Sequence, residues 1–368
     1  MNKNICCSFN FAPHYREEIF LLMEKQLDSE FFFGEKTFGN IKKMNYSKFE
    51  KPVKEFKFKR IFNSFYYLKG QSSLSSKNYD YYLITGQPYN LSSWLLLFRN
   101  KLKKKKTFIW NHGLYGKESF FQKSLKKIQS KFVEGYFLYG NYAKELMIKE
   151  GVCENKLHVI YNSLNYSKSL EIRETLNKTN IYIDYFKNNL PNVIFIGRLT
   201  KVKKLNLLIE AQKRSFNDGK KFNIIIVGEG NVKNELEDLV KESNLEQNVW
   251  FYGACYDEEQ IAELIYNADI CVSPGNIGLT SIHSLSYGTP AITHNNFKNQ
   301  MPEFEAIKEG VTGSFFVENN VESIIEKIQA WLKYNPSNSK KIISNCFSII
   351  DNYYNPNFQV KLLREILK

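Results

Sequence analysis

The sequence predicts an α/β protein of two domains, each built on a doubly wound parallel sheet, and three observations support this prediction. The 368 residues exceed the usual size of one domain. Short apolar runs alternate with amphipathic segments in both halves, as strands and helices do around a parallel sheet. A polar, Asn-rich stretch separates the halves at residues 162–190. We therefore expect domains at 1–165 and 166–350, and a helix in 351–368 that returns to the first domain.

The N-terminal half alternates strand-like and helix-like segments. Ile19 and Met23 recur with helical spacing in residues 14–27, whereas residues 81–85 form a short apolar run typical of a buried strand. Residues 38–60 have weak periodicity, and we interpret them as one strand with a loop. The expected strands are 5–9, 30–33, 81–85, 107–110, 136–139 and 157–160, and the expected helices are 14–27, 91–102, 118–130 and 143–149.

The C-terminal half repeats this alternation. Ligands of doubly wound sheets bind beyond the carboxyl ends of the strands, so the polar residues that follow its strands are candidate site residues. The expected strands are 193–196, 223–227, 249–252, 270–273 and 291–293, and the expected helices are 205–214, 232–242, 258–266, one from Leu279, and 321–332, 339–350 and 359–367.

One segment, Ala268 to His294, combines a strand, a Gly-rich loop, a helix and a second strand. Gly275 and Gly278 allow a tight turn and a close approach of the backbone, and a helix begins near Leu279. The free amides and the helix dipole at such a helix start favour a phosphate. The alternative is an ordinary strand–helix–strand crossover without a ligand.

The formal net charge of +13 indicates an anionic partner, which would be nucleic acid, anionic lipid or a phosphorylated substrate. Lysines are densest in residues 101–106, directly after the apolar residues 94–98. We interpret this stretch as a surface that docks on an anionic membrane, with a solvated face that has no partner as the alternative.

Other features of the sequence bear on its location. No apolar run approaches the ~20 residues that span a bilayer, and no secretion signal is visible. The six cysteines have no C-x-x-C spacing, which excludes an obvious zinc site or disulfide framework. We expect a cytoplasmic protein that associates peripherally with the inner face of the plasma membrane.

Charged side chains follow two strands of the second half. Arg198 comes directly after the strand 193–196, behind Gly197, and Lys203 follows at a helix start. A guanidinium and an ammonium at a strand end can hold a diphosphate, although both can also be ordinary surface residues. Glu229 closes the next strand, where it would accept a hydrogen bond from a ligand hydroxyl or cap a helix.

Three histidines and two glutamates are further candidates. His112 and His294 each follow a strand, and His283 lies about one turn into the helix of the Gly-rich segment. Such a histidine can hydrogen-bond a sugar hydroxyl or carry a proton, or can be structural. Glu303 and Glu305 do not share a helix face, so one would contact ligand and the other solvent. No cluster has metal-ligand spacing, and neither G-x-x-x-x-G-K-[ST] nor G-x-G-x-x-G occurs.

Six motifs follow one another in order over about residues 192–335: V-I-F-I-G-R-L-T-K-V-K-K, I-I-I-V-G-E-G, V-W-F-Y-G, A-D-I-C-V-S-P, G-L-T-S-I-H-S-L-S-Y-G-T-P-A and E-G-V-T-G-S-F-F. This set resembles the second domain of glycosyltransferase family 4, and the first half matches only in general pattern, with N-H-G at His112. The resemblance implies the GT-B fold, in which two Rossmann-like domains face each other across a cleft. It also implies that the enzyme is retaining and uses a nucleotide sugar as donor.

The resemblance assigns roles to particular residues. Arg198 and Lys203 would grip the donor diphosphate, and His112 would sit beside the donor sugar, facing the acceptor held by the N-terminal domain. The implied catalytic residues are His112, Arg198 and Lys203, and the implied donor-binding residues are Gly197, Glu229, Gly275, Asn276, Gly278, Leu279, Thr280, His283, His294 and Glu305.

The sequence departs from the family pattern at two places. The family has two glutamates, separated by seven residues, where this chain has Gly275 and His283. The first holds donor sugar hydroxyls and the second the ribose, so His283 can still bind ribose, whereas Asn276 replaces the first only in part. The segment before E-G-V-T-G is two residues longer than in the family, and Glu305, unlike Glu303, keeps the family distance to the glycine.

The expected function is transfer of a sugar to a glycan acceptor on a lipid carrier, in bacterial capsule or O-antigen synthesis. Neither a metal nor another cofactor is expected, on the same resemblance. The alternatives are an inactive sugar-nucleotide-binding protein, a basic nucleic-acid-binding protein, for which no binding motif is present, and a sugar epimerase of similar two-domain shape.

Overall fold

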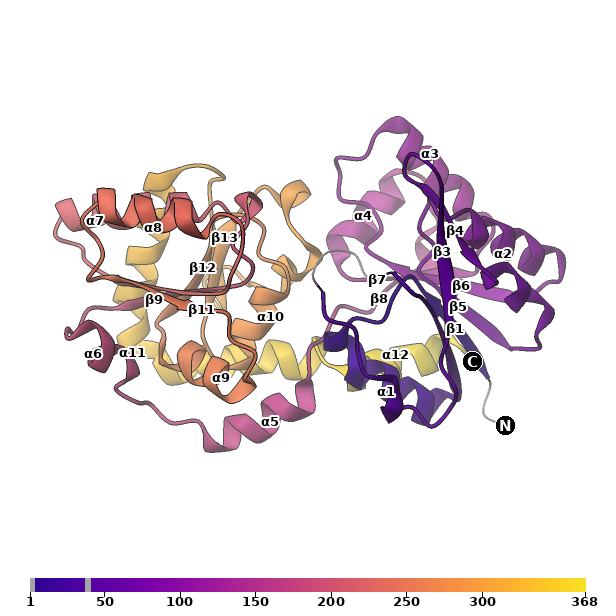
Figure 1. Ribbon diagram of the computed structural model, residues 1–368, viewed down its shortest axis with the longest axis horizontal. Coiled ribbons are helices and arrows are strands. Elements are labelled where there is room, and N and C mark those ends of the chain that lie inside the picture. The colour runs from indigo at the N-terminus through magenta and orange to yellow at the C-terminus, as the bar shows by residue number, and fades with distance from the viewer. Residues whose placement is uncertain (1–3, 37–40) are drawn as a thin grey trace. The chain divides into compact units, whose positions relative to one another are not determined.

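The chain folds into two compact units (Figure 1), described by a computed structural model for residues 4–36 and 41–368, apart from the side chains of residues 335–338. The N-terminal unit comprises residues 1–166 and 355–368, and the C-terminal unit comprises residues 167–354. The domain boundaries predicted from the sequence lay after residues 165 and 350.

The N-terminal unit contains an eight-stranded sheet in the order β4-β3-β2-β1-β5-β6-β7-β8. Neighbouring strands are parallel except at one edge, where β3 and β4 form an antiparallel hairpin. The strands are β1 (Ile5–Phe9), β2 (Ser29–Gly34), β3 (Lys54–Phe62), β4 (Phe65–Lys69), β5 (Tyr81–Ile84), β6 (Lys106–Asn111), β7 (Gly135–Leu138) and β8 (Leu157–Val159).

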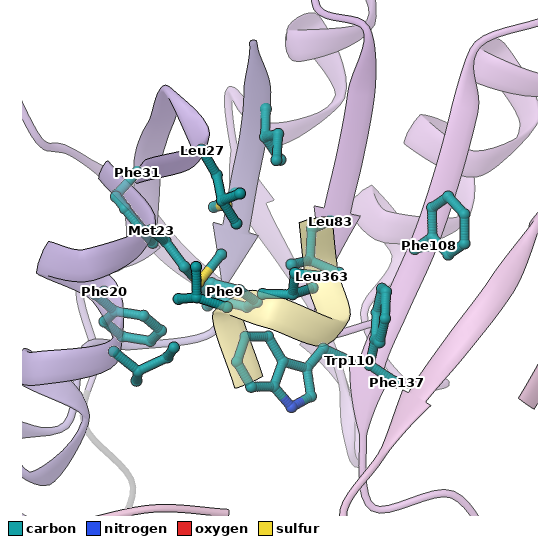
Figure 2. Packing of buried hydrophobic residues seen from close by; sticks show 14 of the residues in the cluster. Phe9, Phe20, Met23, Leu27, Phe31, Leu83, Phe108, Trp110, Phe137 and Leu363 are labelled. Carbon is teal, nitrogen blue, oxygen red and sulfur yellow. The ribbon is translucent and has the colours of Figure 1, made fainter. Parts of the chain in front are cut away.

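Helices cover both faces of this sheet. On one face lie α1 (Glu17–Leu27) and α12 (Pro356–Ile366), and on the other lie α2 (Leu91–Leu102), α3 (Phe120–Gln129) and α4 (Asn141–Lys149). Figure 2 shows Leu363 of α12 inside the cluster of buried side chains that includes Phe9, Phe20 and Trp110. Because α12 completes this core, the last helix of the chain is part of the N-terminal unit.

The C-terminal unit contains a six-stranded parallel sheet in the order β11-β10-β9-β12-β13-β14. Figure 1 shows α7 and α8 on one face of it and α9 and α10 on the other. The strands are β9 (Asn192–Ile196), β10 (Asn223–Val227), β11 (Val249–Gly253), β12 (Ile270–Ser273), β13 (Ala291–His294) and β14 (Gly313–Phe316). The helices are α5 (Tyr166–Thr175), α6 (Ile181–Phe186), α7 (Leu205–Asn217), α8 (Lys233–Glu242), α9 (Glu258–Asn267), α10 (Leu279–Ser286) and α11 (Val321–Tyr353).

Each sheet reverses its strand order once. In the N-terminal sheet the reversal lies between β1 and β5, and in the C-terminal sheet it lies between β9 and β12. At a reversal the connections that leave two neighbouring strands diverge to opposite faces, which leaves space for a ligand at the carboxyl edge. The strand order, which the sequence pattern does not contain, therefore indicates one ligand position in each unit.

The structure corrects several predicted elements. In the segment 38–60, a strand with a loop was expected, and its described residues hold a loop followed by most of β3; residues 38–40 lie outside the described residues. The strand β4, which pairs with β3 in the hairpin, was missed. The helices expected at 321–332 and 339–350 are the single helix α11, because the buried stripe continues with helical spacing from Trp331 to Ile342 and Cys346. The strand β14 and the division of the inter-domain segment into α5 and α6 were also missed.

Candidate functional site

The residues predicted to bind a diphosphate come together at the strand reversal of the C-terminal unit. Arg198 and Lys203 lie in the loop after β9, and Gly275 and Gly278 lie in the loop after the neighbouring strand β12. The hydroxyl of Thr280, in the first turn of α10, donates a hydrogen bond to the carbonyl of Ile196 at 2.8 Å. The helix start is thus tied directly to the end of β9.

Gly275 is fixed by its contact with the β9–α7 loop. Its N–H donates to the carbonyl of Lys203 at 2.9 Å. A Cβ atom at this position would lie 1.9 Å from the carbonyl oxygen of Val202, so no side chain fits without movement of the backbone. The close packing of the two loops therefore explains why a glycine stands where the family pattern has a glutamate.

Lys203 is the most perturbed cation of this loop. Its ammonium donates to the carbonyl of Asn276 at 2.5 Å. Burial, reinforced by the nearby charge of Arg198, lowers its pKa from 10.5 to about 8 against the opposing effect of Glu303. The ammonium is thus desolvated and only partly neutralised, so an anion would stabilise its charged form. Arg198 itself is exposed.

The start of α10 is the second half of the predicted diphosphate site. Gly278 is the N-cap residue, with a φ of 57° and no side chain to cap the helix. The N–H groups of the first turn, from Leu279 and Thr280 onward, have no carbonyl one turn earlier in the helix. With the positive end of the helix dipole they favour an anion, and the cation Lys203 donates into the same loop.

The structure places Glu303 close to this position. Its side chain is buried, and its carbonyl accepts a hydrogen bond from Ser281 of α10 at 2.7 Å. Its charge acts on Lys203, whereas Glu305, which the sequence spacing favoured, is half-buried. The sequence left the choice between the two glutamates undecided, and the packing of the 302–306 turn against α10 brings the charge of Glu303 within reach of Lys203.

His283 and Glu229 are both engaged with other side chains. His283 Nε2 lies 2.8 Å from Glu258 Oε1, and the Tyr287 hydroxyl donates to the same oxygen at 2.6 Å. Although burial opposes it, the interaction with His283 lowers the pKa of Glu258. Glu229 pairs with Lys233 at 2.7 Å and lies at the end of β10. Sequence reasoning missed Glu258 because it lies 25 positions before its partner.

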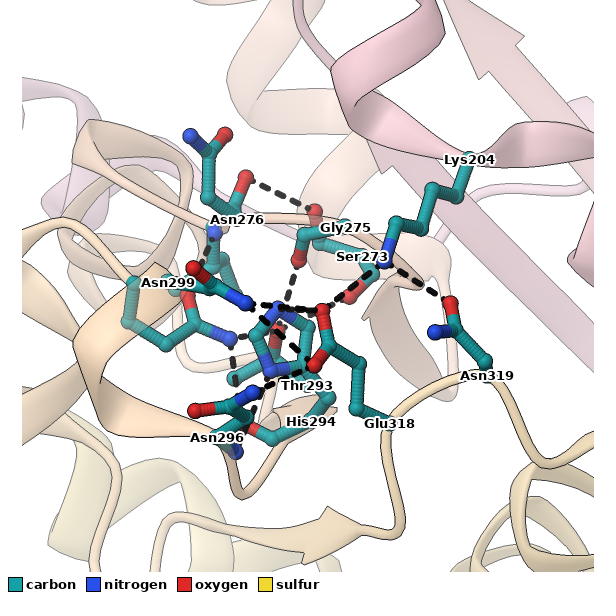
Figure 3. A network of polar contacts seen from close by, with 12 residues as sticks. Lys204, Ser273, Gly275, Asn276, Thr293, His294, Asn296, Asn299, Glu318 and Asn319 are labelled. Atoms are coloured by element: carbon teal, nitrogen blue, oxygen red, sulfur yellow. Dashed lines mark hydrogen bonds and ion pairs between the residues drawn. The ribbon is translucent and has the colours of Figure 1, made fainter. Parts of the chain in front are cut away.

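His294, at the end of β13, lies in a polar network that includes residues of the Gly-rich loop after β12 (Figure 3). Its side chain is 1% exposed, and its Nδ1 accepts a hydrogen bond from the N–H of Asn296 at 3.3 Å. Glu318 at the centre of the network accepts from Lys204 at 2.8 Å and from Asn296 at 2.5 Å. Burial alone would raise the pKa of Glu318, but these bonds outweigh it and lower the pKa to about 2. The network joins the β9–α7 loop to the segment after β14.

The N-terminal unit has a cavity of about 620 Å³ at its own strand reversal. The loops after β1, β5 and β6 line it, together with the β3–β4 hairpin. Its walls are aromatic, and its described lining includes three cations, Arg16, Lys36 and Arg60, and no Asp or Glu. The Arg16 guanidinium lies 5.0 Å from the ring centroids of both Trp110 and Tyr139, in cation–π geometry. Sequence reasoning missed this cavity, since its residues come from segments that lie far apart in the sequence.

His112 lies in the lining of this cavity, at the end of β6. Its ring lies 4.8 Å from that of Tyr139 and stacks at 5.7 Å on that of Tyr115. Burial, with the charges of Arg16 and Lys126, lowers its pKa to about 3. The imidazole is therefore neutral near pH 7 and a weak base, suited to hydrogen bonding more than to carrying a proton. None of the His, Cys, Asp and Glu side chains in the described residues gather in a group that could hold a metal ion.

Comparison with known proteins bears on the C-terminal unit first. Residues 180–346 match the model of the family glycosyl transferases group 1. Over 207 residues the chain is 25% identical to an uncharacterised 41.2 kDa protein in the cps region of Klebsiella pneumoniae, covering 55% of this chain and 53% of that protein. It is 26% identical over 220 residues to an uncharacterised glycosyltransferase of Methanocaldococcus jannaschii, covering 55% and 54%. The chain thus spans about half the length of these curated relatives.

Solved structures extend the likeness in fold to the whole chain. The Anabaena protein HepE, crystallised in complex with UDP, superposes with a TM-score of 0.73 over 99% of both chains at 15% identity. No helix in the described part of the chain is long and apolar enough to cross a membrane. By this likeness the chain has the GT-B fold, and residues 180–346 of its C-terminal unit match the glycosyl transferases group 1 model.

Proposed function

We propose that this protein is a retaining glycosyltransferase, which moves a sugar from a nucleoside-diphosphate sugar to a glycan acceptor. The observation that carries the proposal is the meeting of Arg198, Lys203 and the start of α10 at one strand reversal. The group 1 match over residues 180–346 supports the same activity. HepE, of like fold, was crystallised with UDP, which supports a nucleotide-sugar donor.

The C-terminal unit would bind the donor. Arg198 and Lys203 would neutralise the diphosphate, and the amides of Gly278, Leu279 and Thr280 would donate to its oxygens. As the sugar leaves, negative charge grows on the β-phosphate, so these contacts strengthen in the transition state. Glu229, at the end of β10, lies where the nucleoside would extend.

The N-terminal unit would bind the acceptor in its 620 Å³ cavity. Aromatic walls with a few amide and cationic groups suit a ligand with apolar faces and hydroxyl edges. His112 would hydrogen-bond a sugar hydroxyl as a neutral imidazole. Since no described carboxylate lines the cavity, the acceptor proton would pass to the leaving phosphate, as in a retaining reaction without a protein base.

The proposal includes metal independence and a role in bacterial capsule or O-antigen synthesis on a lipid-linked acceptor. The relative in the cps (capsule) region of Klebsiella pneumoniae supports the role in capsule synthesis. A cytoplasmic location, with docking on the inner face of the plasma membrane, belongs to the same proposal.

The first test is a thermal-shift screen against UDP, GDP and dTDP and their sugars, because bound nucleotide raises the melting temperature. In a turnover assay with the donor so identified, Arg198→Ala should lower kcat by roughly 100-fold, the loss of one charge-assisted contact in the transition state. The matched control is Lys213→Ala, which removes an exposed cation of α7 that is not among the predicted site residues. Near-normal turnover of Arg198→Ala would remove this residue from the site.

An inactive sugar-nucleotide-binding protein is the second candidate. The tight contact of Gly275 with Val202 favours it, because no glutamate can occupy the position at which the family binds donor sugar hydroxyls. Such a protein would bind nucleotide in calorimetry but would turn over no donor with any acceptor, or with water.

A further inference from the structure

Large apolar side chains are exposed on two neighbouring segments of the N-terminal unit. At the tip of the β3–β4 hairpin, Ile61 is 50% and Phe62 is 67% exposed. In the first turn of α3, Phe120 is 86% and Phe121 is 58% exposed. Single exposed apolar residues need no explanation, but a group of this size marks an interaction surface.

Contacts show that these two segments lie side by side. Phe65, which begins β4, packs edge-to-face on Tyr89 with a ring separation of 5.4 Å. The Tyr89 hydroxyl accepts a hydrogen bond from Gln122 in the first turn of α3 at 2.9 Å. Figure 1 shows the end of the hairpin beside α3. We call the exposed residues Ile61, Phe62, Phe120 and Phe121 the apolar edge.

The hairpin behind the apolar edge is strongly basic. Lys57 and Lys69 are directly opposite each other in the antiparallel register, and Lys59 is two residues along on the same face. No ion pair found among the described residues includes any of these three lysines. Like charges directly opposite destabilise a hairpin, and an anionic partner would relieve this repulsion.

We propose that the apolar edge and these lysines dock the protein on an anionic lipid membrane. Apolar side chains at the tip would enter the interface while lysines contact the headgroups, which is the combination that holds peripheral proteins on membranes. A single-stranded nucleic acid would contact the lysines and can stack bases on the phenylalanines, but it offers nothing to the aliphatic Ile61, whereas a lipid interface accepts all four side chains. The combined apolar and basic character therefore favours lipid over nucleic acid.

The same hairpin lines the cavity of the N-terminal unit. Arg60, Asn63 and Phe65 belong to its lining and adjoin Ile61 and Phe62 in the sequence. Docking through the apolar edge would bring the cavity close to the bilayer surface, where the head of a lipid-linked acceptor lies. This last step rests on the proposed sugar transfer, whereas the docking itself is argued only from the apolar edge and the lysines.

The proposed docking surface differs from the segment that the sequence indicated. Within residues 94–98, Leu96 and Leu97 are fully buried, and the Trp94 indole donates to the carbonyl of Pro88 at 2.8 Å. In the lysine run, Lys103 donates to Ser75 and Lys105 to Tyr82. Of the large apolar side chains of α2, Leu91, Phe98 and Leu102 remain exposed, and the last two provide a matched control surface.

The test is vesicle flotation of the full chain, with phosphatidylcholine alone and with 30% phosphatidylglycerol added. The wild type should bind only the anionic vesicles, and less strongly as salt rises. Phe62→Ser/Phe120→Ser should abolish binding, and Lys57→Gln/Lys59→Gln should weaken it about 30-fold, roughly fivefold for each lysine. The controls Phe98→Ser/Leu102→Ser and Lys101→Gln/Lys104→Gln should bind like the wild type.

Two outcomes would overturn the proposal. One is the absence of wild-type binding to anionic vesicles at low salt. The other is loss of binding in the α2 controls with retention in the hairpin and α3 variants, which would restore the surface indicated by the sequence. Unchanged nucleotide binding in calorimetry shows that each variant is folded. A protein that docks but binds no nucleotide would refute the proposed function and leave this inference standing.

Discussion

Because of Lys203, the affinity for the nucleotide donor should fall as pH rises. The Lys203 pKa of about 8 in the unliganded protein, lowered from 10.5 by burial and by Arg198, means that the contact with a diphosphate is complete below this pH and is lost as pH rises through it. With this pKa about nine-tenths of the lysine is charged at pH 7 and about one-tenth at pH 9. If only the charged form binds strongly, the Kd for UDP should rise about tenfold over this interval.

The assay is isothermal calorimetry with UDP at pH 7, 8 and 9, a range in which the terminal phosphate, with a pKa of about 6, stays ionised. Lys203→Arg keeps its charge throughout, so its Kd should not change with pH. Lys203→Met should bind about tenfold or more weakly at pH 7 and should show no slope.

The reasoning fails if the wild-type Kd is the same at pH 7 and pH 9. It also fails if Lys203→Met retains the wild-type slope, because another group would then be titrating. A Lys203→Arg variant that binds as weakly as Lys203→Met at every pH would point to a steric requirement for the lysine and would leave the slope of the wild type as the deciding measurement.

Three further predictions concern the surroundings of the site. Gly275→Ala should lower the free energy of unfolding by about 1–3 kcal/mol in urea titrations, since its Cβ would collide with the Val202 carbonyl; unchanged stability would mean that the loop moves freely. Glu318, whose folded pKa of about 2 lies below the ordinary 4.5, stabilises the fold above pH 4.5 and loses this effect as pH falls toward 2, so Glu318→Gln should flatten that part of the pH–stability curve. Excess EDTA should leave turnover unchanged, and inhibition reversed by Mg²⁺ would contradict metal independence.

The sequence predicted the fold class because its strongest signals are local. Apolar runs such as 193–196 and 223–227 are buried strands that the structure places at β9 and β10. The strand β4 was missed, and β3 was expected only as an unplaced strand within 38–60, because the hairpin lies at a sheet edge, where most side chains of β3 are exposed and the apolar pattern is weak. Local pattern thus reveals strands in the centre of a sheet better than strands at its edge.

The site was predictable only where its residues are close in the sequence. Gly275, Gly278 and Thr280 belong to one Gly-rich segment, and their neighbourhood follows from the strand–loop–helix pattern. His283 could not be placed, because its partner Glu258 belongs to the preceding helix. The cavity of the N-terminal unit depends on which strands are neighbours, and strand order is fixed by long-range packing that a single sequence does not display.

The two adjacent lysines of the β9–α7 loop show how the structure separates a binding residue from a structural one. Lys204 donates to Glu318 and to Asn319, both at 2.8 Å, so its charge is matched within the fold. Lys203 donates instead to a carbonyl oxygen, and its pKa is lowered because burial and Arg198 outweigh the single opposing glutamate, Glu303. An ammonium that the fold buries without fully neutralising gains most from an arriving anion. This difference in environment, which the dipeptide itself does not reveal, is the reason we propose Lys203 rather than Lys204 as the ligand of the diphosphate.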